Sequence, residues 1–327
     1  MSVPPPAVVI VTHVGGPRLE ACVRSLHGQG AAELRVVVSR HDPLPVPPGA
    51  IGQQLRANPG FAGAANAGLR AVSPALPVVL LNDDTVAAPG FLAALRAAAA
   101  GGGPGIYQPV IELDGAGGAL DNAGHGLLPD GANLARGRGG RAVPPGAEAG
   151  AFSGAAVWLC PEVRSAVGLF DESFEAYGED VDLSLRAVRQ GYRVRVVPEA
   201  RIRHALGASY GRASPRKVFL VERNRVRAAV RSLPWAAVAT MPLSTPARYG
   251  LLLAAAAGGR GLGAGVGPAG AAAAVAGALA SLRHLPADLR ARRAAAPAWR
   301  VDDRGMWGHL WAHRPRRADL LATLGPA

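Results

Sequence analysis

Two acidic clusters and one histidine stand out as residues able to support a reaction. Residues 82–84 (NDD) follow an apolar run, residues 178–182 (GEDVD) open a segment with helical spacing, and His204 follows a later apolar run. Adjacent carboxylates supply the hard oxygen ligands that Mg or Mn takes, usually together with substrate phosphates. A carboxylate at the start of a helix is rigidly held and can accept the proton of a hydroxyl group. The clusters therefore predict a metal site and a general base.

Each of these features also has a structural explanation. The acids at 82–84 can cap a following helix or form a turn, and for this segment alone the two interpretations are equally good. The acids at 179–182 stand where a helix dipole favours negative charge, and Asp182 is spaced to pair with Arg186. A single histidine such as His204 is more often a structural residue than a ligand. Only the combination of the three favours a metal site.

A run of small residues at 58–68 (NPGFAGAANAG) is a weaker candidate. Small residues that lead into a helix allow close backbone approach, and the amides at the helix start can bind a phosphate or a ribose. A tight entry into a helix explains the same pattern, so this run carries little weight by itself.

The elements that must hold these residues alternate along the first half of the chain. Residues 7–12, 34–38 and 78–81 are apolar runs typical of parallel strands covered on both faces, and residues 17–26 have helical spacing. Alternating strands and helices predict an α/β fold with a doubly wound sheet. In such sheets ligands bind beyond the carboxyl ends of the strands. The polar residues at these ends are Thr12, Ser39 and the cluster at 82–84.

The middle of the chain is less regular. Residues 101–150 are rich in Gly and Pro and predict a loop-heavy insertion with short strands around 107–113. A strand is predicted at 155–160 and another at 192–198. Between them, a helix is predicted from near Asp180 to just before Gly191.

The composition changes after Pro234, which predicts two regions, 1–233 and 234–327. The second region is dominated by Ala, Gly, Leu and Arg. Its uncharged stretch at 261–282 is long enough to span a bilayer, but it is mostly Gly and Ala and contains Pro268. We therefore expect helices that lie on a membrane surface or on the main domain rather than a membrane span.

Charge and cysteine content limit the class of protein. The 327 residues carry a formal net charge of +12, but Lys217 is the only lysine, and the arginines accompany a general excess of Ala, Gly and Pro. This pattern indicates a compositional bias, so no nucleic-acid partner is expected. Cys22 and Cys160 lie far apart and predict reduced thiols of a cytoplasmic protein. The first residues lack the basic region of a signal peptide and predict a buried strand.

Together and in this order, the segments resemble glycosyltransferase family 2, the inverting enzymes of GT-A fold. Within the family they are most similar to the bacterial rhamnosyltransferase-like branch, which builds cell-wall and surface polysaccharides. Residues 167–204 form the most specific match. The matching stretches run from about residue 7 to 230 and are VVIVTH, NPGFAGAANAGL, LLNDDT, FSGAAVWL, VGLFDESFEAYGEDVDLSLRAVRQGYRVRVVPEARIRH and ERNRVR.

The resemblance implies a role for each matching residue. Asp84 and His204 would bind a divalent cation, Mg or Mn, which offsets the charge of a departing diphosphate. Asp180 would be the base, with Glu179 beside it, and a single displacement would invert the anomeric configuration. The positions implied to bind the donor are Thr12, Asn58, Gly63, Asn66, Asn82, Asp83, Ser153 and Gly154.

The implied reaction transfers a sugar from a nucleotide-diphosphate donor, and the resemblance favours dTDP-rhamnose or a UDP-sugar as that donor. The acceptor would be a hydroxyl of a glycan or a polyprenyl-linked molecule at the inner face of the plasma membrane. Two departures leave the nucleobase open. His13-Val14 stand where the family has an aromatic residue and Asn, and residues 39–42 (SRHD) replace Asp-Asn-x-Ser, with Asp42 as a candidate substitute.

Two other functions compete with this one. A sugar nucleotidyltransferase would carry a Gly-rich basic loop after the first strand, which residues 14–18 only faintly resemble. That function does not explain residues 178–180 or His204. A degenerate GT-A scaffold that binds a glycan or a partner is suggested by the altered segment at 39–42, but it gives no reason to keep Asp84, Asp180 and His204 together.

Overall fold

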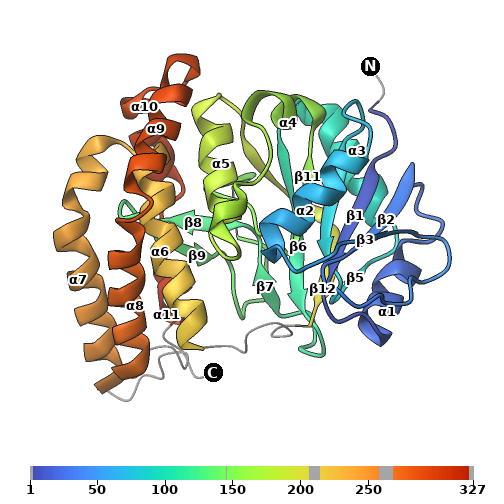
Figure 1. Ribbon diagram of the computed structural model, residues 1–327, viewed down its shortest axis with the longest axis horizontal. Helices are drawn as coiled ribbons and strands as arrows, with labels where there is room; N and C mark the ends of the chain where they lie inside the picture. The colour runs from blue at the N-terminus through green and yellow to red at the C-terminus, as the bar shows by residue number, and fades with distance from the viewer. Residues whose placement is uncertain (1–2, 145, 206–213, 258–267, 324–327) are drawn as a thin grey trace.

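The chain folds into a mixed α/β structure with a layer of helices on one side (Figure 1). The computed structural model describes residues 3–144, 146–205, 214–257 and 268–323. Within these residues a ten-stranded sheet has the strand order β10-β12-β6-β11-β4-β1-β2-β3, with β5 attached to β12 and β7 attached to β6. The predicted α/β class is confirmed.

One half of the sheet is parallel, as its apolar runs predict. Its strands are β1 (Ala7–Thr12), β2 (Glu33–Val38), β3 (Ile51–Gln54) and β4 (Val78–Asn82). β1 is central, between β2 and β4, so that its residues are covered on both sides. The predicted strands at 7–12, 34–38 and 78–81 are confirmed. The edge strand β3 was not predicted, because its sequence IGQQ is short and largely exposed.

The other half mixes strand directions. β11 runs antiparallel to both β4 and β6, and β12 runs parallel to β6. The strands are β5 (Thr85–Ala87), β6 (Ile106–Leu113), β7 (Leu120–Asn122), β10 (Glu148–Ala149), β11 (Ala156–Leu159) and β12 (Val194–His204). Because β11 is reversed, its start lies beside the end of β4, with Ala156 opposite Leu81. The end of β12 also reaches this edge, with His204 opposite Thr85.

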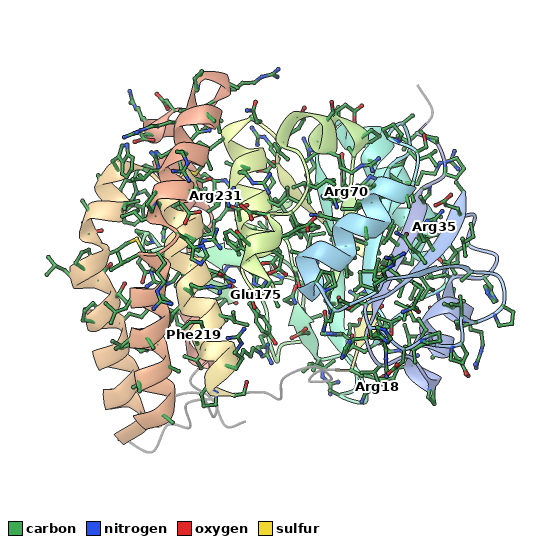
Figure 2. All side chains as sticks on the ribbon, in the orientation of Figure 1. Arg18, Arg35, Arg70, Glu175, Phe219 and Arg231 are labelled. Carbon is green, nitrogen blue, oxygen red and sulfur yellow. The ribbon has the colours of Figure 1, made fainter. Side chains whose placement is uncertain are left out.

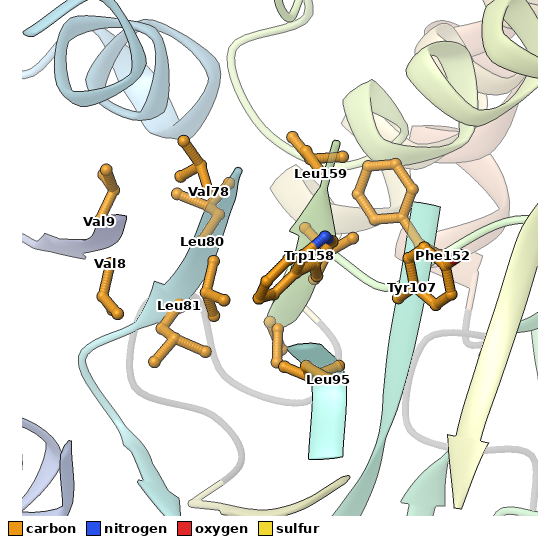
Figure 3. Close-up of a cluster of buried hydrophobic side chains, with 14 of the residues drawn as sticks. Val8, Val9, Val78, Leu80, Leu81, Leu95, Tyr107, Phe152, Trp158 and Leu159 are labelled. Carbon is orange, nitrogen blue, oxygen red and sulfur yellow. The ribbon is translucent and has the colours of Figure 1, made fainter. Parts of the chain in front are cut away.

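The centre of the sheet is apolar (Figure 3). Val8, Leu80 and Trp158 come from the adjacent strands β1, β4 and β11, and each is fully buried. Burying a side chain of the size of Val or Leu contributes about 1.5–3 kcal/mol. β1, β4 and β11, next to whose ends several candidate residues lie, are therefore anchored in the apolar core.

Helices cover the faces of this sheet. α1 (Pro17–Leu26) follows the predicted spacing, with Pro17 in its first turn. α2 (Gly60–Ala71) packs on β1 and β2. A Cβ atom at Gly68 of α2 would lie 2.4 Å from Val9, so this position requires glycine for close helix–strand approach. The other helices here are α3 (Phe91–Gly102), α4 (Pro161–Val167), the 3-10 turn η1 (Glu172–Phe174) and α5 (Glu179–Arg189).

The segment 101–150 is more structured than its composition predicts. The strand β6 agrees with the short strand predicted around 107–113, but β7 and β10 also join the main sheet. β8 (His125–Leu127) and β9 (Asn133–Ala135) form a separate pair. These strands have two or three residues each, so they are defined by pairing, β7 and β10 with longer strands and β8 with β9, rather than by a periodic sequence.

The C-terminal part is helical, as predicted. Its elements are α6 (Pro215–Ser232), α7 (Trp235–Ala257), α8 (Pro268–Ser281), α9 (Leu285–Ala295), the 3-10 turn η2 (Ala296–Ala298), α10 (Asp303–Ala312) and α11 (Arg317–Thr323). α6 packs against α5, α8 and α9, and Figure 1 shows α6–α10 on the side away from β1–β3. The division at residue 234 stays a prediction.

No helix among the described residues is long and apolar enough to cross a bilayer. Part of the uncharged stretch at 261–282 lies outside the described residues. The rest of it forms α8, which begins at Pro268.

Candidate active site

The sheet topology brings several predicted residues to one edge. Asp84 lies in the turn between β4 and β5, Ser153 and Gly154 precede β11, and His204 ends β12. The backbone confirms how closely these segments meet, since the N–H of Asn82 donates to the carbonyl of Ala155 at 3.0 Å. Segments that lie far apart in the sequence therefore meet at one edge of the sheet.

Asp84 and His204 face each other at this edge. Nε2 of His204 lies 3.2 Å from Oδ1 of Asp84, and both side chains are nearly buried. That carboxylate oxygen accepts no hydrogen bond from the described residues. A buried oxygen without a donor, next to an imidazole nitrogen, suits a hard divalent cation that takes its other ligands from phosphates. Among the described residues, no group of three or more His, Cys, Asp or Glu is arranged to hold a metal by itself.

The second nitrogen of His204 contacts another carboxylate. Nδ1 lies 3.2 Å from Oδ2 of Asp121, and the other oxygen of Asp121 accepts from Arg138 at 3.1 Å. Burial alone would lower the pKa of His204, but Asp121 and Asp84 outweigh burial and raise the pKa to about 9. Burial would raise the pKa of Asp121, yet His204 and Arg138 lower it.

Asp180 is held rigidly in the first turn of α5. Its Oδ2 accepts the backbone N–H of Gly154 at 3.0 Å, and its Oδ1 accepts the N–H of Val181 at 2.8 Å. The carboxylate is therefore tied both to its own helix and to the loop before β11. It is only partly buried, which leaves it accessible to a reacting hydroxyl group.

Glu179 lies in a different environment from its neighbour. Its side chain is buried, and Oε2 has no hydrogen-bond partner among the described residues. Burial, followed by the nearby charge of Asp180, raises the pKa of Glu179 well above its ordinary value. Burial thus disfavours the charged form of Glu179, whereas the carboxylate of Asp180 is only partly buried.

The loop before α5 is strained and firmly anchored. Glu175 and Tyr177 have φ values of 65° and 66°, which are uncommon for residues with side chains. Asn224 of α6 donates from Nδ2 to the carbonyls of Phe174, Ala176 and Tyr177 at 2.9, 3.0 and 2.6 Å. Arg223 donates to the carbonyl of Phe174 at 2.9 Å and pairs with Glu175 at 2.7 Å. α6 thereby fixes the approach to Asp180.

Thr12 and Asp83 meet at the end of β1. The hydroxyl of Thr12 donates a short hydrogen bond to Oδ2 of Asp83 and accepts the N–H of Gly15 at 2.9 Å. Burial, opposed by the bond from Thr12, raises the pKa of Asp83. Asn82 ends β4 next to this pair. Thr12, Asn82 and Asp83 thus lie at the same strand ends as Asp84.

Asn58 belongs to a second polar set. Its Oδ1 accepts from the hydroxyl of Ser39 at 3.2 Å and from the N–H of Gly60 at 2.9 Å. Nδ1 of His13 lies 2.8 Å from the carbonyl oxygen of Ser39. These residues join the ends of β1 and β2 to the start of α2. Asp42 lies apart, 73% exposed, and pairs with its neighbour Arg40.

Two donor-site predictions fall on residues that have structural contacts. Asn66 is buried and exchanges two hydrogen bonds with the backbone of Phe170, at 2.9 and 3.0 Å, besides one to Glu172. Gly63 lies one turn earlier, and a Cβ atom there would lie 2.7 Å from Pro59. These contacts explain both residues without a ligand, and their role in donor binding stays a prediction.

Ser153 and Gly154 are held by side chains from β6 and α5. The N–H of Ser153 donates to Gln108 at 2.7 Å, and that of Gly154 donates to Asp180. Gln108, Asp121 and Arg138 lie between residues 101 and 150 and were not predicted as functional. A short Asp-Asn pair after Leu120 was the only signal for Asp121, and such pairs are common in turns.

Comparison with protein families adds a sequence-based result. A family described as glycosyl transferase family group 2 matches residues 77–245, which is more than half of the chain and includes Asp84, Asp180 and His204. A comparison with curated proteins finds no match.

Solved structures show a related fold. The crystal structure of GalNAc-T7 with UDP, GalNAc and Mn2+ superposes with a TM-score of 0.56 at 17% identity, covering 70% of this chain and 48% of that chain. The present chain thus spans about half of that protein. The mannosyltransferase PcManGT from Pyrobaculum calidifontis, in complex with GDP-Man and Mn2+, superposes with a TM-score of 0.50 at 18% identity, covering 90% and 86% of the two chains. At these identities the likeness shows the fold alone.

Proposed function

The chain belongs to glycosyl transferase family group 2, and from this premise we propose that it is a metal-dependent, inverting glycosyltransferase. It transfers a sugar from a nucleotide-diphosphate donor to a hydroxyl of a glycan or lipid-linked acceptor. The observation that carries the proposal is the pairing of Asp84 with His204 at the same sheet edge as the tethered carboxylate of Asp180. The rhamnosyltransferase-like branch is part of the proposal and rests on sequence resemblance.

Asp84 and His204 are the residues that would hold a divalent cation, Mg or Mn. The donor-free oxygen of Asp84 and the facing Nε2 of His204 fit such an ion. Two structures of related fold were solved with Mn2+ and a nucleotide, which supports the same type of cofactor here. When bound, the cation would offset the negative charge on the departing diphosphate.

Asp180 would accept the proton of the acceptor hydroxyl. The hydroxyl oxygen then forms a bond to the anomeric carbon from the face opposite the diphosphate, and the bond to the diphosphate breaks with its electron pair. One displacement inverts the configuration. The hydrogen bond from Gly154 fixes the direction of the Asp180 carboxylate, and the burial of Glu179 disfavours a second charge beside it.

The donor would lie across the ends of β1, β2 and β4. Thr12, Asn82 and Asp83 are placed to meet the sugar or ribose, and Asn58 with Ser39 and His13 to meet the nucleobase. Asp42 is exposed and paired with Arg40, so Ser39 and Asn58 are the better candidates for base recognition. A dTDP-sugar or a UDP-sugar is the proposed donor.

Contact with a lipid-linked acceptor would use the C-terminal helices. Val275, Leu279 and Leu282 stand at helical spacing on or just after α8 and are 61%, 62% and 58% exposed. Arg283 and Arg290 are exposed nearby. Apolar side chains flanked by arginines suit the anionic inner face of the plasma membrane. Flotation with vesicles that contain anionic phospholipid should carry the protein upward, and Leu279→Asp with Leu282→Asp should abolish this; unchanged flotation of the variant would reject the contact.

A second candidate is a non-catalytic scaffold of the same fold that binds a glycan or a partner. The observation in its favour is the segment at 39–42, in which the one acid, Asp42, is exposed and engaged with Arg40.

A panel of nucleotide-sugars separates the two functions. The purified protein is incubated with each donor and Mn or Mg, and release of the nucleoside diphosphate is measured for wild type, Asp84→Ala and Asp180→Asn. Metal-dependent release from one donor, lost in both variants, is expected from the transferase. Absence of both release and metal-dependent nucleotide binding throughout the panel would favour the scaffold.

A further inference from the structure

The imidazole of His204 lies between two carboxylates that contact its opposite nitrogens. Nε2 faces Asp84, and Nδ1 lies 3.2 Å from Oδ2 of Asp121, whose side chain is 6% exposed. Carboxylate oxygens only accept hydrogen bonds. The contact to Asp121 therefore requires a hydrogen on Nδ1, and Nε2, which faces Asp84, is the nitrogen at which a cation would take the place of a proton.

Asp121 is itself held firmly by its surroundings. Arg138 donates to its Oδ1 at 3.1 Å, and Leu120 exchanges backbone hydrogen bonds with residues 139 and 140, at 2.9 and 2.7 Å. β7, which carries Asp121, pairs with β6, and β6 pairs in turn with β12, which carries His204. The carboxylate is thus held by Arg138 and by the backbone pairing of β7 as well as by the histidine.

We propose that Asp121 is a positioning residue that orients His204 and fixes its Nδ1–H tautomer, so that Nε2 is presented to the cation beside Asp84. The inference rests on the metal-dependent function proposed above and adds a residue to it. Histidines that bind metals generally donate their other N–H to a carboxylate or carbonyl, and loss of that partner weakens metal binding about 10–100-fold. Arg138 balances the charge of Asp121 and keeps that carboxylate directed at the ring.

A purely structural role for Asp121 in seating the β6–β7 hairpin makes a different prediction. Asp114 provides the matched control, because it lies at the end of the same hairpin and pairs with Arg203, the residue before His204. Both acids link the hairpin to β12, but the Asp114 carboxylate pairs with Arg203, and only the backbone N–H of Asp114 contacts His204, donating to its carbonyl at 3.1 Å. Asp114→Asn and Asp121→Asn therefore each remove one negative charge from this hairpin, but only Asp121→Asn removes a side-chain contact to the imidazole.

The test is titration of the full-length protein with Mn2+ alone, following the free ion by electron paramagnetic resonance. Asp121→Asn should bind Mn2+ about 10–100-fold more weakly than wild type, while Asp114→Asn should bind like wild type. Pulsed spectra of the bound ion should contain a nitrogen coupling from His204 that Asp121→Asn weakens. Asp121→Glu keeps a carboxylate acceptor and should retain most of the affinity, which controls for a folding defect in the asparagine variant.

The possible results separate this inference from its premise. Wild-type affinity in Asp121→Asn, with binding lost in Asp84→Ala, would overturn the role of Asp121 and leave the metal site in place. Equal weakening in Asp114→Asn and Asp121→Asn would assign both acids to hairpin stability and also overturn the inference. Absence of Mn2+ binding by the wild-type protein would remove the proposed metal-dependent function and the inference with it.

Discussion

The central sheet and the C-terminal helices each contain buried side chains, but different interactions hold the two regions together. Around β1, β4 and β11 the buried side chains are apolar (Figure 3). Between α5, α6 and α9 the buried side chains include arginines and carboxylates. Arg227 of α6 pairs with Asp288 of α9 at 3.0 Å, with side chains only 2% and 3% exposed. We call these arginines and carboxylates between α5, α6 and α9 the charged layer. Figure 2 shows Arg231 and Glu175 in the same region, between α5 and α6.

This difference explains how the arginine-rich composition is used. Arginine can form two parallel hydrogen bonds to a carboxylate and can also stack on an aromatic ring, which lysine cannot do as well. Arg227 lies 4.3 Å above the ring of Phe174, and Arg292 lies 4.1 Å above that of Trp235. The net charge of +12 is therefore partly inside the protein, and it does not by itself indicate a basic surface for nucleic acid.

The charged layer also reaches the candidate active site. Arg223 and Asn224 belong to α6 and hold the strained loop that leads into Asp180. The apolar sheet thus sets the positions of Asp84 and His204, and the charged helical layer sets the approach to Asp180. Changes to the two regions should affect stability in different ways.

The largest effect is expected from leaving one buried charge unpaired. Arg227→Met should lower the free energy of unfolding by about 3–5 kcal/mol, because Asp288 loses its closest partner. The double variant Arg227→Met with Asp288→Leu should recover most of that loss, since an apolar pair removes both charges. Denaturant unfolding of the three proteins measures this. A double variant as unstable as the single one would show that the layer is not held as described.

A cavity in the sheet should have a comparable but simpler effect. Leu80→Ala removes a fully buried side chain of β4 and should cost about 2–5 kcal/mol. No second substitution in the charged layer should compensate for this loss, because the two sites have no shared partner. This independence is tested by denaturant unfolding of Leu80→Ala alone and of Leu80→Ala combined with Arg227→Met and Asp288→Leu. Strong coupling would contradict the separation of the two regions.

A smaller effect is expected from acid titration of Asp171. Burial would raise the pKa of Asp171, but Ser173 and Arg231 of the charged layer outweigh burial and lower the pKa from 3.8 to about 2. A depressed pKa gives stability that is present above the unfolded value and is lost as pH falls through the folded one. The thermal unfolding temperature of wild type should therefore fall more between about pH 4 and pH 2 than that of Asp171→Asn. Parallel curves would rule out this contribution, and Asp114→Asn serves as the control.

The smallest effect is expected at an exposed pair. Arg24 and Glu20 of α1 lie 3.9 Å apart, with side chains 73% and 58% exposed. Arg24→Ala should change the free energy of unfolding by less than about 0.5 kcal/mol, because water and salt screen such pairs. Thermal unfolding at low and high salt measures this value. A loss as large as that of Arg227→Met would mean that burial is not what separates strong from weak ion pairs here.

The strands that form the sheet centre were predictable because each is a continuous apolar run. Residues 7–12 and 78–81 are bounded by polar residues, and β1 and β4 match them closely. The helix predicted from near Asp180 also agrees with α5, since its apolar spacing ends before Gly191. Local pattern was sufficient wherever an element is long and periodic.

The candidate site was only partly predictable for physical reasons. Asp84 and His204 were paired through resemblance to a family, since their contact depends on antiparallel pairing of β5 with β12. Asp121 was missed because β7 has three residues and no periodicity of its own. Likewise, the contacts of Asn66 with Phe170 depend on tertiary packing that small-residue composition does not reveal.

The measurement that tests the central claim most directly compares Asp180→Asn with Asp84→Ala for metal-dependent binding of nucleotide diphosphate and for sugar transfer. If Asp84 serves metal and donor binding and Asp180 serves proton acceptance, Asp180→Asn should bind nucleotide with Mn2+ like wild type. Its rate of sugar transfer should fall about 10²–10⁴-fold. Asp84→Ala should lose both binding and transfer. Transfer at the wild-type rate in Asp180→Asn, or metal-dependent binding that survives in Asp84→Ala, would contradict the account.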